Sequence, residues 1–133
     1  YIYEMLVIIL DSFRKTPERG DPKADAIMDA INYIRDHIAE ELDTPMLARR
    51  AFMSRTYFSA LFTRVCGVPP HEYVITLRIN RAKKLLADTS LPVWRVAELS
   101  GFSDASALAR MFRMRCGVNP TAYRSEEYTP ARN

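Results

Sequence analysis

The sequence predicts an all-α fold in which two similar pairs of helices are joined by a long connecting helix. Apolar residues recur at the three- and four-residue spacing of helices along most of the chain. The phrase CGVPPHEY, which begins at Cys66, returns as CGVNPTAY at Cys116, an offset of 50 residues. A recurrence at one fixed spacing indicates a duplicated structural unit. The stretch between the two copies reads as a single helix from about Pro70 to Ala87.

The N-terminal part is predicted to hold two helices separated by a linker. A short helix is expected over residues 1–15, and prolines, a glycine and charges mark residues 16–23 as the linker. A second amphipathic helix is expected from Lys23 to Glu41. The two apolar stripes are Ile2, Leu6, Ile9 and Phe13 in the first helix, and Ile27, Ile31, Ile34 and Ile38 in the second. The first stripe could pack on its own chain or form a dimer seam, and the sequence leaves both open.

Each copy of the repeat reads as two helices joined by a tight turn, which is the helix-turn-helix arrangement. The first copy covers about residues 44–67, with Thr44 as the expected N-cap and Pro45 in the first helical position. Its second helix, RTYFSALFTRVC, follows Ser54 as N-cap, and the equivalent helix in the second copy (about 92–117) is ASALARMFRMRC. Both helices end at Cys-Gly, where glycine supplies the left-handed stop. Their buried stripes are predicted to be Phe58, Leu61, Phe62 and Val65, and Leu108, Met111 and Phe112.

The two turns differ at one position. In the second copy Ala97 is small enough for a close helix crossing, and Gly101 can adopt the positive φ that the turn needs. In the first copy Ala48 is present, but Phe52 stands where glycine is expected. That turn must therefore use another conformation or tolerate strain.

Charge is distributed unevenly along the chain. The net charge is +3, yet residues 1–41 carry five Lys/Arg against nine Asp/Glu, and residues 42–133 carry fourteen against seven. No acidic residue occurs from Ser54 to His71 or from Ala105 to Ser125. Acid-free stretches within a basic surplus favour a polyphosphate partner.

Several other classes of protein are disfavoured. The longest apolar run, MLVIIL, is too short to span a bilayer, and no signal peptide is readable, so we expect a soluble, cytoplasmic protein. Cys66 and Cys116 stand alone before glycines, without metal-ligand spacing, and no cofactor or metal is expected. A catalytic pair of Cys66 and His71 is a weak alternative, since no further catalytic group stands at readable spacing. Because the chain begins with Tyr rather than Met, we expect a fragment of a longer protein.

Three stretches together resemble the DNA-binding domain of the AraC/XylS family of bacterial transcription regulators. They are RAKKLL on the connecting helix, VAELSGFSDASALARMFR in the second copy and the terminal GVNPTAYR. The resemblance covers about residues 24–124, within a predicted DNA-binding domain of residues 24–126, and Phe52 and Ala107 depart from the family pattern. It implies seven helices, no enzymatic activity, double-stranded DNA as partner and RNA polymerase as a second candidate partner. It also implies a missing N-terminal domain for effector sensing or dimerisation. Residues 1–15 would be the end of that domain or a linker helix leading out of it, and residues 127–133 would be a tail.

The resemblance also assigns residues to DNA contacts, through the second helix of each copy in the major groove. The positions aligned with base reading are Arg55, Thr56, Ser59 and Ala60 in the first copy, and Ala105, Ser106, Ala109 and Arg110 in the second. Arg110 is the strongest single candidate because a guanidinium can grip guanine with two hydrogen bonds. Contacts to phosphates are expected from Arg64, Arg95, Arg113 and Arg115. Arginines and lysines of the connecting helix (Arg78, Arg81, Lys83 and Lys84) are expected to be structural or solvated.

Two further interpretations stay open at this stage. In one, the chain is a helical protein-interaction module whose basic faces bind an acidic partner. In the other, the chain is a regulator in which only the second copy reads sequence. Because the copies differ in sequence, we expect an asymmetric DNA site, and whether the protein activates or represses is not readable.

Overall fold

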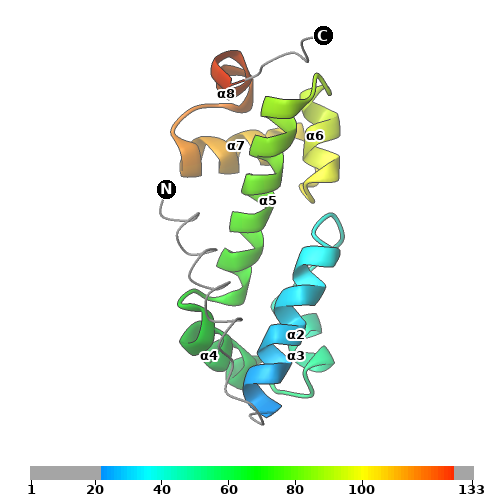
Figure 1. Ribbon diagram of the computed structural model, residues 1–133, viewed down its shortest axis with the longest axis vertical. Coiled ribbons are helices and arrows are strands. Elements are labelled where there is room, and N and C mark those ends of the chain that lie inside the picture. Colours follow the sequence, from blue (N-terminus) through cyan, green and yellow to red (C-terminus); the bar gives the residue numbers. More distant parts are fainter. Residues whose placement is uncertain (1–21, 128–133) are drawn as a thin grey trace. The chain divides into compact units, whose positions relative to one another are not determined.

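The computed structural model describes residues 22–127, and all regular structure in that range is α-helical (Figure 1). Seven helices follow one another: α2 (Pro22–Asp36), α3 (Thr44–Arg50), α4 (Arg55–Cys66), α5 (Pro70–Asp88), α6 (Val93–Leu99), α7 (Ala105–Cys116) and α8 (Pro120–Glu127). The predicted all-α class with seven helices is confirmed. The helix expected at residues 1–15 lies outside the described residues. Within the described range, no helix combines the length and apolar character needed to cross a membrane.

The described chain folds as two compact units. The first unit contains residues 22–37 and 42–76, and the second contains residues 38–41 and 77–127. Helix α5 contributes residues to both units. The second unit therefore includes a four-residue segment that precedes α3 in the sequence.

The core of the first unit forms where the isoleucine stripe of α2 meets α3 and α4. Ile27, Ile31 and Ile34 are fully buried, as the helical spacing predicts. Phe58 and Phe62 of α4 are also fully buried, and their rings lie 5.7 Å apart between centroids. Burying such side chains contributes roughly 1.5–3 kcal/mol each, so this cluster holds the three helices together.

The second unit repeats this plan around α5, α6 and α7. Leu86, Val96, Leu108 and Phe112 are fully buried. Ala97, also fully buried, allows the close approach of α6 and α7 that its small side chain predicts.

The repeated phrase closes both units in the same way. Gly67 and Gly117 end α4 and α7 with left-handed φ angles of 83° and 81°, as predicted. A buried proline, Pro70 or Pro120, then begins the next helix. Three residues later a tyrosine ring meets a core phenylalanine edge-on, with centroids 5.6 Å apart for Phe62–Tyr73 and 5.3 Å for Phe112–Tyr123.

Two predicted helix ends were wrong. Helix α2 stops at Asp36 rather than continuing to Glu41. Residues 38–41 belong to the second unit, where Arg78 donates hydrogen bonds to the Ile38 and Glu40 carbonyls, so the chain leaves the helical path after Asp36. The N-cap of α3 is Asp43 rather than Thr44, since its carboxylate accepts a hydrogen bond from the Met46 amide at 2.8 Å. Asp43 has the extended backbone of an N-cap, whereas Thr44 is already the first residue of the helix.

Candidate nucleic-acid interface

Helices α4 and α7 are fixed at both ends by equivalent interactions. Ser54 caps α4 by accepting a hydrogen bond from the Tyr57 amide at 3.1 Å, as predicted. Asp104 caps α7 by accepting one from the Ala107 amide at 2.8 Å. Side chains on these helices are thus presented from rigid, capped elements.

The buried stripes determine which faces stay exposed. On α4, Phe58, Leu61 and Phe62 are buried, and on α7 Leu108 and Phe112 are buried. Residues that are i and i+4 apart on the opposite side share a face directed away from each core.

Most of the predicted base-reading residues lie on these open faces. Arg55, Thr56 and Ala60 of α4 are exposed, and Ser59 is half-buried at the edge. On α7, Ser106 and Arg110 are exposed, whereas Ala105 and Ala109 are half-buried beside the core. The neighbouring alanines and serines have short side chains, which would let the helix backbone approach a DNA groove closely.

The predicted phosphate contacts fall into three environments. Arg64 and Arg113 are exposed on α4 and α7, free of any acidic residue on their own helix. Arg115 is half-buried on the side of α7. Arg95 of α6 forms an ion pair with Glu98 one turn later, so its charge is partly neutralised. Arg95 is therefore the weakest of the four candidates.

The exposed face of α7 continues to Met114, a residue that our sequence reasoning did not include. Met114 follows Arg110 by four residues and is 76% exposed. The equivalent position in α4, 50 residues earlier, is Arg64. The i+4 spacing alone would have placed Arg64 and Met114 on the exposed faces of their helices. At this position α4 carries a charge and α7 does not.

The first turn adopts the same conformation as the second, despite Phe52. Phe52 has a φ of 58° and Gly101 a φ of 88°, so the prediction that this turn changes conformation or tolerates strain resolves in favour of strain. The amides that follow, of Met53 and Phe102, donate to the carbonyls of Ala48 and Ala97 at 3.0 and 2.9 Å. Equal hydrogen bonding holds the two turns in one geometry.

The cysteines have the character of core residues. Cys66 is buried, and this burial raises the pKa of its thiol to about 12. Burial also raises the pKa of the Cys116 thiol. Thiols held protonated in this way are poor nucleophiles and poor metal ligands. Among the described residues, no group of three His, Cys, Asp or Glu side chains is placed to hold a metal ion.

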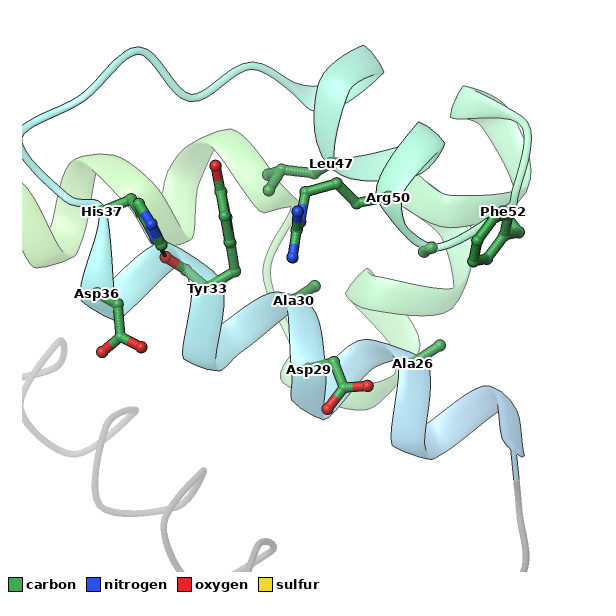
Figure 2. Close-up of a pocket in the computed structure, with 10 residues that line it drawn as sticks. Ala26, Asp29, Ala30, Tyr33, Asp36, His37, Leu47, Arg50 and Phe52 are labelled. Atoms are coloured by element: carbon green, nitrogen blue, oxygen red, sulfur yellow. Dashed lines mark hydrogen bonds between the residues drawn. The ribbon is translucent and has the colours of Figure 1, made fainter.

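A groove of about 400 Å³ lies between α2 and α3 in the first unit (Figure 2). The Arg50 guanidinium lies 3.8 Å from the ring centroid of Tyr33. The Tyr33 ring also stacks on the His37 ring, with their centroids 3.9 Å apart. Asp29 and Asp36 also line the groove, and both are exposed. Because exposed carboxylates repel phosphates, this groove does not belong to the basic surfaces of α4 and α7.

Comparison with known proteins agrees with this geometry. A family model described as a helix-turn-helix domain matches residues 47–126. The probable transcriptional regulator LumQ of Photobacterium leiognathi is 38% identical over 92 residues, which cover 69% of this chain and 37% of that regulator. The chain thus spans little more than a third of this relative's length.

Two solved structures are similar over most of this chain. One is the DNA-binding domain of the transcriptional factor AdpA in complex with a target DNA, with a TM-score of 0.73 and 34% identity, covering 75% of this chain and 90% of that one. The other is a regulator from Chromobacterium violaceum described as having an AraC-type DNA-binding domain. It has a TM-score of 0.71 and 27% identity, and the match covers 81% of this chain and 96% of that one.

Proposed function

We propose that this chain, which belongs to the AraC family of helix-turn-helix DNA-binding domains, binds double-stranded DNA through α4 and α7 with sequence specificity. The observation that carries the proposal is the pair of capped helices, each with a buried stripe on one side and an acid-free exposed face on the other. Each helix would enter a major groove with its N-terminal half towards the bases.

Base reading is proposed for the exposed residues in the first two turns of each helix. Arg110 would donate two hydrogen bonds to a guanine, which discriminates against other bases by about 1–3 kcal/mol. Thr56 and Ser106 would offer hydroxyls, and Ala60 would offer only apolar contact, for example to a thymine methyl group. Arg55 is the exposed arginine at the start of α4, and Arg110 is kept as the strongest single candidate for base reading.

Phosphate contacts would come from arginines at the edges of the same faces. Arg64 and Arg113 are proposed to hold the DNA backbone and to fix the register of each helix without reading sequence. Each phosphate contact releases counterions, so affinity should fall with salt with a slope of about 0.9 per contact.

The length of α5 supports a site of two parts. Its 19 residues correspond to about 28 Å, which is comparable to one turn of B-DNA at about 34 Å. Since α4 and α7 carry different side chains, the proposed site is asymmetric rather than palindromic.

The whole protein is proposed to be a bacterial transcription regulator that acts in the cytoplasm. Since this chain spans only 37% of its relative LumQ, effector sensing would belong to parts outside the present sequence. Contact with RNA polymerase, and dimerisation through residues 1–15, are parts of the same proposal. It includes no catalytic step.

Selection of bound duplexes from a random pool tests this function directly. We expect an asymmetric sequence with two conserved blocks about one helical turn apart, bound with steep salt dependence. A single block would favour the version in which only α7 reads sequence. Absence of duplex binding at low salt would overturn the proposal and favour the protein-interaction module.

A further inference from the structure

The segment of residues 38–41 belongs to the second unit, although the chain on both sides of it belongs to the first. The chain therefore crosses between the units three times: after residue 37, after residue 41 and after residue 76. Only the last crossing is made within the connecting helix α5. The first two crossings are short, so whatever holds this segment also restrains the first unit.

Arg78 of α5 holds the segment with two hydrogen bonds. Its Nε donates to the Ile38 carbonyl at 3.1 Å, and its Nη2 donates to the Glu40 carbonyl at 2.6 Å. Arg78 is half-buried, and this desolvation lowers the pKa of its guanidinium. Hydrogen bonds from an ionised donor are stronger than neutral ones, which makes this a firm attachment.

Gly101 closes the other side of the same attachment. A Cβ atom at this position would lie 2.3 Å from the Ile38 carbonyl oxygen and 2.6 Å from the Arg78 Nε. Only glycine allows the turn before α7 to approach so closely. Ile38 itself is 9% exposed, so the segment is packed as well as hydrogen-bonded.

Arg81, one turn further along α5, makes a similar bond with a different consequence. Its Nε donates to the Leu99 carbonyl at 2.7 Å. Leu99 lies within the continuous stretch 77–127, so this bond joins parts of the second unit that the chain already connects. Arg78 differs because its acceptors come from a segment between two crossings.

We propose that Arg78 is a positioning residue for two-part DNA binding, because it restricts the motion of one DNA-binding unit with respect to the other. The inference rests on the proposed function. When two binding modules are joined, the affinity for a double site depends on an effective concentration that falls as the tether loosens. With Arg78 in place the units share a restrained connection, and without it α5 is the main restraint.

The test compares a full site with two half-sites in the parent chain and two variants. The full site is the duplex that the parent chain selects, and each half-site has one of its two blocks scrambled. For Arg78→Met we expect affinity for the full site to fall about tenfold, with less than about a twofold change for either half-site. The matched control, Arg81→Met, removes one arginine–carbonyl bond from the same helix and should keep the parent's ratio of full-site to half-site affinity.

The outcomes separate positioning from damage. An unchanged ratio in Arg78→Met overturns the inference, and so does an equal loss for full and half-sites, since that pattern indicates local unfolding of the second unit. Circular dichroism establishes that each variant is folded. If Arg78→Met does not fold, Arg78→Lys retains a charge and one donor group, and should show a smaller loss with the same dependence on site. A parent chain that binds full and half-sites equally would instead refute the two-part function itself.

Discussion

Replacing Phe52 by glycine should stabilise the first unit, although it removes a large aromatic side chain. Phe52 has a φ of 58°, in the left-handed region that residues with a Cβ atom avoid. Its side chain is 96% exposed, so the ring contributes almost nothing through burial. The substitution therefore removes a backbone penalty at little cost in packing.

The magnitude follows from two opposing effects. A non-glycine residue in the left-handed region costs about 1–2 kcal/mol. Glycine also makes the unfolded chain more flexible, which lowers the free energy of unfolding by about 0.4–1 kcal/mol and offsets part of this gain. We therefore expect Phe52→Gly to raise the free energy of unfolding by about 0.5–1 kcal/mol.

Urea unfolding followed by circular dichroism measures this change, with Phe52→Ala as the matched control. Alanine removes the same ring and keeps a Cβ atom, so its stability should stay close to that of the parent. In contrast, Gly101→Ala should lower the free energy of unfolding by more than about 2 kcal/mol, since φ is +88° and the new Cβ would lie 2.3 Å from the Ile38 carbonyl oxygen. If Phe52→Gly is no more stable than Phe52→Ala, the reasoning about left-handed strain is refuted.

Three further predictions concern DNA binding and the cysteine. Arg110→Ala should lower the binding free energy for the specific duplex by about 1–3 kcal/mol and relax the preference at one base position. Arg113→Ala should weaken binding to all sequences alike, and site selection with each variant distinguishes the two effects. Asp104→Ser keeps the N-cap and removes a carboxylate from the start of α7, so binding to specific and scrambled duplexes should strengthen equally in titrations. A loss for the specific duplex alone would mean that the carboxylate accepts a hydrogen bond from a cytosine. Cys66 should resist iodoacetamide at about pH 8. With a pKa of about 12, its thiol forms on the order of a thousandfold less thiolate than a cysteine in an unfolded chain. Mass spectrometry measures the labelling, and rapid modification of Cys66 would contradict the prediction.

Elements stabilised by local interactions could be predicted from the sequence. Helix α4 is an example: Ser54 caps its start, Phe58 and Phe62 form its buried stripe and Gly67 ends it. All of these signals lie within 14 residues of one another. The equivalent signals define α7, which is why the repeat could be read as two helix-turn-helix units.

Features that depend on distant residues could not be predicted. The periodicity of α2 continues through Ile38, yet the helix ends at Asp36, and the segment that follows is hydrogen-bonded to Arg78, 40 residues beyond Ile38. Helical spacing alone cannot identify such a distant contact. By contrast, the ion pair of Arg95 with Glu98 is local, and the i,i+3 spacing of these residues on one helix could have indicated it from the sequence.

For the candidate interface, too, the sequence predicts what depends on residues of the same helix and not what depends on neighbouring helices. Helical spacing separates the exposed faces of α4 and α7 from their buried stripes, so the general location of the proposed DNA contacts follows from the sequence. The degree of exposure within a face does not. Ala105 and Ala109 prove half-buried at its edge. These differences depend on how closely neighbouring helices approach.

The attachment of residues 38–41 also explains why the two turns differ in sequence. Both turns need a left-handed residue, since Phe52 and Gly101 occupy the same position in the same hydrogen-bonded geometry. At Gly101 a second constraint is added, because the Ile38 carbonyl lies where a Cβ atom would stand. Phe52 points into solvent, so its turn meets only the first constraint, which costs about 1–2 kcal/mol and can be tolerated. Glycine is thus required only in the unit that receives the segment, and the divergence between the two copies follows from an asymmetry in how the chain is connected.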